Sequence, residues 1–136
     1  MTNFREVGAL IGFETADAAE LLVIYWHEPV GRTAGALPDD AALWDRIWAH
    51  RANLLGFAHT HPGGGAPPAP SHEDLTTFIA IEHALGECLY WWIINETHAV
   101  YCTRDVTAAP TQPTRYTVTV AAPQPWMDEL RRRSNI

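Results

Sequence analysis

The chain has 136 residues, of which 47% are hydrophobic; this fits one globular domain with a single core and excludes a largely disordered protein. The formal net charge of −7 excludes the basic surface that a nucleic-acid-binding protein presents to phosphates. No apolar run approaches the roughly 20 residues that span a bilayer, and the N-terminus does not resemble a signal peptide, so we expect a cytoplasmic protein without a membrane anchor.

The first third of the chain predicts two strands and a helix. Val7 to Phe13 is an apolar run, and Glu20 to Trp26 reads as a second strand that pairs with it. After a loop rich in Gly and Pro, Asp39 or Asp40 suits the N-cap of a helix. The large apolar residues that follow recur at helical spacing: Leu43, Trp44, Ile47 and Trp48.

The middle of the chain predicts a buried strand, a loop and a second helix. Leu54 to His59 is short and apolar, as expected of a strand inside a sheet. Gly63 to Pro70 is a loop of Gly and Pro residues, and Ser71 begins a helix that ends near Gly86. We expect this helix to bury one face: Leu75, Phe78, Ile79 and Leu85.

The last third predicts three strands and a C-terminal segment. Cys88 to Asn95 and His98 to Thr103 are predicted to form a hairpin, with Trp91 and Trp92 on opposite faces of the first strand. Thr114 to Ala121 alternates as a further strand does. Pro125 to Ile136 is predicted to be a short helix or a tail.

This order of elements predicts an α/β fold, in which a single mixed β-sheet carries flanking helices. We expect one domain over residues 1–125, followed by the short C-terminal helix or tail over residues 126–136.

The chemistry of the chain is concentrated in two short motifs. His59-Thr60-His61-Pro62 is followed, after the Gly/Pro loop, by Ser71-His72-Glu73-Asp74. In an extended segment the side chains of His59 and His61 leave the same face, and Asp74 lies in the first turn of the following helix. Two imidazoles and one carboxylate are the ligand types of a catalytic zinc site, which keeps its fourth position for water.

Each motif alone also has a structural explanation. A His-x-His pair is commonly a pair of surface or core histidines, and Ser-x-x-Asp is commonly a helix cap in which Ser71 accepts an amide hydrogen bond. The combination of a strand-end pair, a short loop and a helix-opening carboxylate favours the metal site. The two roles are compatible, because Ser71 can cap the helix while Asp74 faces the metal.

These residues resemble the motif of the JAMM/MPN+ family of zinc metalloproteases, H-[ST]-H-P-x(n)-S-x-x-D, in its prokaryotic form. Glu6 to Gly12 is similar to the family's upstream segment E-x-x-G-L-L-x-G, and the resemblance covers roughly Glu6 to Asn95. It implies the MPN fold, which is of the JAB and cytidine-deaminase type. A helix normally precedes the family's glutamate, whereas only five residues precede Glu6 in this chain.

The resemblance also implies a role for each matching residue. His59, His61 and Asp74 would ligate one zinc ion, with water as the fourth ligand. Ser71 would stabilise the developing oxyanion or orient the water, and Glu6 would be the general base. The spacing from Glu6 to Gly12 is one residue shorter than is usual in the family, so Glu28 is the alternative base.

The function implied is zinc-dependent hydrolysis of a peptide or isopeptide bond. The substrate would be a ubiquitin-like or sulfur-carrier-type protein, which the enzyme removes from a conjugate or matures. Two alternatives stay open: a catalytically silent MPN-type scaffold or binding module, and a metal-dependent hydrolase of a small molecule.

Overall fold

A computed structural model describes residues 3–15, 17, 20–105 and 114–136. The strands in these residues are β1 (Gly8–Gly12), β2 (Leu22–His27), β3 (Leu54–Thr60), β4 (Tyr90–Ile94), β5 (Ala99–Arg104) and β6 (Tyr116–Val120). The helices are α1 (Ala41–Ala49), α2 (His72–Leu85) and α3 (Pro125–Ser134).

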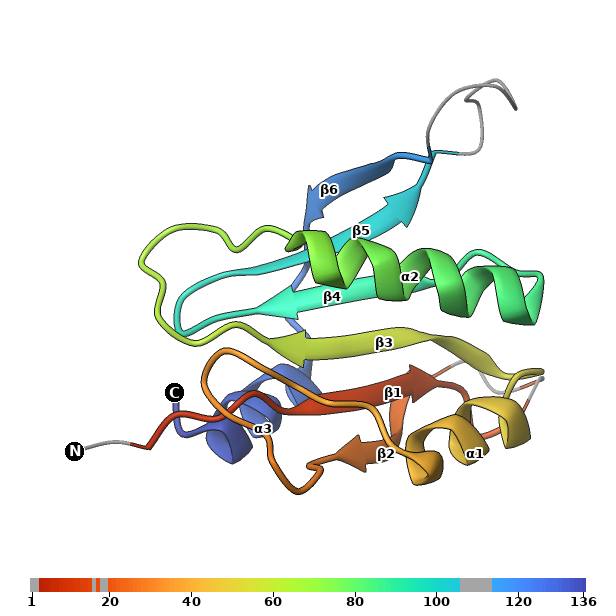
Figure 1. Cartoon of the computed structure of the whole chain (residues 1–136), viewed down its shortest axis with the longest axis horizontal. Helices are drawn as coiled ribbons and strands as arrows, with labels where there is room; N and C mark the ends of the chain where they lie inside the picture. The colour runs from red at the N-terminus through yellow and green to blue at the C-terminus, as the bar shows by residue number, and fades with distance from the viewer. Residues whose placement is uncertain (1–2, 16, 18–19, 106–113) are drawn as a thin grey trace.

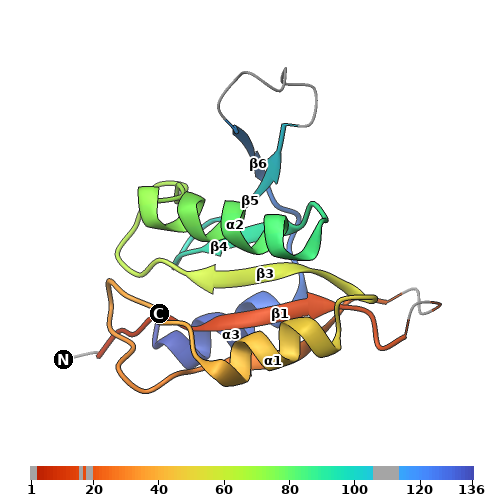
Figure 2. The same ribbon diagram turned by 45° about the vertical axis from the view of Figure 1, so that its right-hand side comes forward.

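The strands form one mixed sheet in the order β2-β1-β3-β4-β5-β6. Neighbouring strands are antiparallel except β3 and β4, which are parallel and are joined by helix α2. A parallel pair needs such a crossover connection. Helices α1 and α2 lie on one face of the sheet and α3 lies on the other (Figures 1 and 2). The predicted α/β class and mixed sheet with flanking helices are therefore confirmed.

Each face of the sheet has its own hydrophobic core, and neighbouring residues of β4 serve different cores. Trp91 packs on the side of α1 and α2, in the core that also contains Leu10, Ile47 and Phe78. Trp92 packs on the side of α3, as the period-2 alternation of a strand requires. The prediction that these two rings lie on opposite faces is confirmed.

Helix α3 fixes the N-terminal segment that leads into β1. Ser134 accepts the N–H of Arg5 at its backbone oxygen at 3.2 Å, and its hydroxyl donates to the backbone oxygen of Arg5. The same hydroxyl lies 2.9 Å from Oγ1 of Thr60, which in turn accepts the N–H of Val7. The helix that packs against the segment carrying Glu6 thus follows the sheet in the sequence rather than preceding it.

One prediction about a buried face was wrong at a single residue. Ile79 of α2 is 40% exposed, and the residues that this helix buries are Phe78, Ile81 and Glu82. Trp44 and Trp48 of α1 are also exposed, because this helix turns Leu43 and Ile47 toward the sheet. In the part of the chain that the structure describes, no helix is long and apolar enough to cross a membrane.

Candidate metal centre

The two histidines of the first motif lie at the C-terminal end of β3 and face helix α2. His59 is the sixth residue of this strand and His61 follows its end, so both side chains leave the same face of the sheet. Their Nε2 atoms are 2.9 Å apart. Nδ1 of His59 is buried and has no hydrogen-bond partner among the described residues, so Nε2 is the nitrogen that faces the other polar groups.

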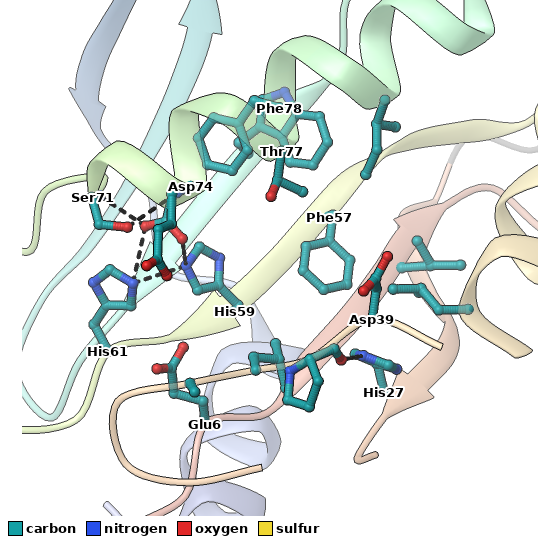
Figure 3. A pocket seen from close by; sticks show the side chains of 18 of the residues that line it. Glu6, His27, Asp39, Phe57, His59, His61, Ser71, Asp74, Thr77 and Phe78 are labelled. Carbon is teal, nitrogen blue, oxygen red and sulfur yellow. Dashed lines mark hydrogen bonds and ion pairs between the residues drawn. The ribbon is translucent and has the colours of Figure 1, made fainter. Parts of the chain in front are cut away.

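Asp74 reaches both histidines from the first turn of α2 (Figure 3). Its Oδ1 is 3.3 Å from Nε2 of His59, and its Oδ2 is 3.1 Å from Nε2 of His61. Ser71 is the N-cap of this helix, where its hydroxyl accepts the N–H of Asp74 and its own N–H is donated to Oδ2 of Asp74. The Asp74 carboxylate therefore takes part in the helix cap and also contacts both histidines.

Glu6 approaches the histidines from the neighbouring strand. Gly8 of β1 is paired with His59 of β3, and Thr60 donates its N–H to the backbone oxygen of Val7. Continuing this antiparallel register places Glu6 opposite His61. Ligand atoms of Glu6, His59 and His61 all lie within 4.8 Å of one another, and the Glu6 side chain is buried.

The donor set fits a zinc ion. Ligand atoms about 2.0–2.1 Å from zinc in a tetrahedron lie roughly 3.3 Å from one another. The contacts from Asp74 to His59 and His61 are close to this separation, and the two imidazole nitrogens are slightly nearer. The carboxylates of Asp74 and Glu6 both lie close to the two histidines. Asp74 contacts both imidazoles at 3.3 and 3.1 Å, whereas the ligand atom of Glu6 lies within 4.8 Å of theirs.

The charges of these groups are coupled. Burial raises the pKa of Asp74, but hydrogen bonds from His59 and His61 outweigh burial and hold this pKa below its usual range. Burial lowers the pKa of His59, whereas in His61 the Asp74 carboxylate outweighs burial and raises the pKa. Burial raises the pKa of Glu6 to about 7. The site thus combines one ionised carboxylate with a second that is close to its midpoint near neutral pH.

The alternative base lies elsewhere. Glu28 forms an ion pair with Arg133 of α3, with 3.3 Å between Oε2 and Nη1, and it does not line the cavity that contains the histidines. The structure therefore brings Glu6, and not Glu28, to the two histidines.

The loop between the two motifs is attached to the turn that follows β4. Gly63 and Gly64 each donate a backbone N–H to the Glu96 carboxylate at 2.8 Å. Asn95 donates its side-chain amide to the backbone oxygen of Ala66 at 2.7 Å. These three bonds hold the loop that connects His61 to Ser71.

A cavity of about 510 Å³ opens beside the candidate metal centre, between the loop before α1, α1 itself and α2. Glu6, His59, His61, Ser71 and Asp74 all line it. Away from these groups its lining is largely apolar: Leu10, Leu43, Phe57, Phe78, Ile81 and Trp91.

Residues 2–116 match the family described as prokaryotic homologs of the JAB domain. This match spans most of the chain, including both motifs and Glu6. The chain belongs to the prokaryotic JAB-domain family. The predicted family and the JAB/MPN fold are confirmed for this JAB domain. A search of curated proteins finds no match to it.

Two features of this JAB domain were not predicted from the sequence. The cavity beyond the histidines depends on how α1 and α2 are placed on the sheet, although the position of Phe57 two residues before His59 in the same strand was an available signal. The Glu96 contact gave no sequence signal, because it joins residues that are 32 and 33 positions apart.

Proposed function

We propose that this JAB domain is a zinc-dependent peptidase that hydrolyses a peptide or isopeptide bond. Its substrate would carry a ubiquitin-like or sulfur-carrier-type protein, whose flexible tail would lie beside the zinc. The observation that carries this proposal is the meeting of Asp74 with both His59 and His61 at 3.3 and 3.1 Å, with Glu6 across the same cavity.

The proposed ligands are His59, His61 and Asp74. Zinc, when bound there, supplies Lewis acidity and lowers the pKa of water at the site. The three residues come from the end of β3 and the first turn of α2, so the fold holds them together without a contribution from another chain.

Glu6 is the proposed proton carrier. Its carboxylate accepts the proton of the attacking water and returns that proton to the leaving amine nitrogen, so no net proton is consumed by the side chain. Its place in the same cavity as the histidines supports this role, because a general base must lie within reach of the proton that it removes.

Ser71 is the proposed donor to the developing oxyanion. Its hydroxyl oxygen accepts the N–H of Asp74, which leaves the hydroxyl hydrogen available to donate. Ser71 also lines the cavity, so that hydrogen can be directed toward a bound carbonyl oxygen.

Metal content and turnover, measured on the wild type and on three variants, test the proposal. The wild-type chain should bind one zinc, and Asp74→Ala should bind little. Glu6→Gln should retain zinc but lose cleavage of a ubiquitin-like protein fused to a C-terminal peptide. Glu28→Gln is the matched control, because Glu28 pairs with Arg133 away from the cavity, and it should retain both zinc and turnover.

Two outcomes would contradict the proposal. Absence of zinc from wild type and variant alike would remove the metal site. Stoichiometric zinc with equal, background turnover in wild type and Glu6→Gln would instead favour the catalytically silent scaffold or binding module.

A further inference from the structure

The cavity is too large to be a packing defect of the core. Protein interiors contain few voids larger than a water molecule, whereas sites for small ligands are mostly apolar and range over roughly 300–1,000 Å³. The volume of about 510 Å³ lies within this range. Its apolar walls therefore favour an apolar ligand over water.

The apolar part of the cavity begins next to the candidate metal centre. The ring of Phe57 stacks on His59 with 6.2 Å between centroids, and the ring of Phe78 lies 6.5 Å from the same imidazole. Trp91 continues this surface, because it stacks on Phe78 at 4.3 Å. A peptide held with its scissile bond at the histidines would therefore place a neighbouring side chain against the half-buried ring of Phe57.

The carboxylates and imidazoles of the cavity lie at its ends rather than among its apolar residues. Figure 3 shows Phe57 between the histidines and the opposite end, where Asp39 and His27 lie. Acidic side chains line both ends, so a negatively charged side chain would be repelled. A glycine would leave the half-buried ring of Phe57 uncovered.

We infer that this cavity is a specificity pocket that receives one large apolar side chain, such as phenylalanine or leucine, from a substrate residue near the scissile bond. The inference rests on the proposed peptidase function and adds the class of side chain that the enzyme selects. The large residue would enter the pocket while the scissile bond lies at the candidate metal centre.

Two adjacent threonines of α2 provide a matched pair of variants. Thr77 lines the cavity, whereas Thr76 does not, and both are exposed residues of the same helix. Thr77→Trp should fill part of the pocket, and Thr76→Trp is the control for adding the same side chain to the same helix. Circular dichroism establishes that both variants are folded.

The first measurement uses a library of peptides of known sequence and the zinc-loaded full chain, with products identified by mass spectrometry. Wild type should cleave peptides with Phe, Tyr, Leu, Ile or Met at one fixed position at least tenfold faster than those with Ala or Gly there. Thr77→Trp should abolish this preference and Thr76→Trp should keep it. Cleavage without a preference for large apolar residues would overturn the pocket.

The second measurement does not depend on catalysis. N-acetyl-L-phenylalaninamide is titrated into isotope-labelled full chain, with N-acetyl-L-alaninamide as the matched control, and NMR signals are followed with and without a chelator. The phenylalanine compound should shift signals of Phe57, Thr77 and Trp91 in both conditions, and should not do so in Thr77→Trp. Equal shifts with the alanine compound, or shifts located elsewhere, would overturn the pocket.

Together the two measurements separate the pocket from the peptidase function. If no peptide is cleaved but the phenylalanine compound binds the cavity, the pocket is supported and the proposed hydrolysis is not. If peptides are cleaved but that compound does not bind the cavity, the hydrolysis is supported and the pocket is overturned.

Discussion

Asp74 and Ser71 are joined by two hydrogen bonds, and the Asp74 carboxylate also contacts the two histidines. Ser71 donates its N–H to Oδ2 of Asp74 at 2.9 Å, and Asp74 donates its N–H to the Ser71 hydroxyl at 3.0 Å. Oδ2 also lies 3.1 Å from Nε2 of His61. The start of helix α2 and one side of the candidate metal centre are therefore a single structural unit.

Substitutions of Ser71 should separate its capping role from its proposed catalytic role. Ser71→Ala removes the cap and should lower the free energy of unfolding by about 1 kcal/mol. Ser71→Gly has no side-chain donor, yet glycine at an N-cap costs only a few tenths of a kcal/mol, so its stability should be close to that of wild type. Both variants should lose on the order of 10²-fold in turnover if the hydroxyl stabilises the oxyanion.

Urea unfolding and turnover of the same preparations provide the measurement. Full turnover in Ser71→Gly would show that the Ser71 hydroxyl does not stabilise the oxyanion.

The two cysteines should differ in reactivity. Burial raises the pKa of Cys102 to about 11, and its side chain is inaccessible, whereas Cys88 is exposed. Because the folded-state pKa of Cys102 is raised above its ordinary value of 9.0, the associated stability is complete below pH 9 and is lost as pH rises toward 11. At pH 8.5, iodoacetamide should modify Cys88 in the folded protein and both cysteines in urea.

Mass spectrometry of the alkylated protein counts the added groups, and Cys88→Ala is the control, which should remain unmodified until it unfolds. Rapid modification of Cys102 in folded Cys88→Ala would mean that the α1/α2 side of the sheet opens readily.

The local signals in this sequence predicted the elements well. Ser71 begins α2 and Gly86 ends it with a φ of 70°, because capping depends on residues within one turn of the helix end. The His59 and His61 side chains share a face for a similarly local reason, since the strand repeats every two residues. The histidines and the carboxylate of the candidate metal centre could therefore be predicted from the sequence.

Contacts between residues far apart in the sequence could not be predicted from it. The choice between Glu6 and Glu28 depends on the pairing of Gly8 with His59, which joins segments 51 residues apart. The burial of Glu82, and the exposure of Ile79 on the same helix, depend on how α2 is rotated on the sheet. Periodicity indicates that a helix has a buried face but does not fix its final rotation.

Glu82 should be important for stability although it is far from the proposed chemistry. Its buried carboxylate accepts the N–H of Leu89 at 2.7 Å, the indole N–H of Trp91 at 3.3 Å and the hydroxyl of Tyr116. Glu82→Ala would leave these donors without their acceptor and should lower the free energy of unfolding by on the order of 3 kcal/mol. Tyr116→Phe removes one of the donors and should cost about 1 kcal/mol.

Chemical denaturation of the two variants beside wild type measures these differences. Equal, small effects of Glu82→Ala and Tyr116→Phe would mean that water replaces the carboxylate without cost.

Glu96 should control how firmly zinc is held, although it does not contact the histidines in the proposed site. Its carboxylate accepts the N–H groups of Gly63 and Gly64, and this fixes the loop that carries the chain from His61 to Ser71 and Asp74. Glu96→Ala frees the loop, so zinc binding must then order it, and the affinity should fall about tenfold. Glu96→Gln keeps one acceptor oxygen and should show a smaller loss.

Competition with a chromophoric chelator measures the zinc affinity, and Glu87→Ala, which removes an exposed carboxylate outside this loop, is the charge-matched control. If Glu96→Ala and Glu87→Ala lose affinity equally, the effect is one of net charge. A loss confined to Glu96→Ala, with unchanged unfolding by urea, assigns the effect to the loop, because a general loss of stability would appear in both measurements.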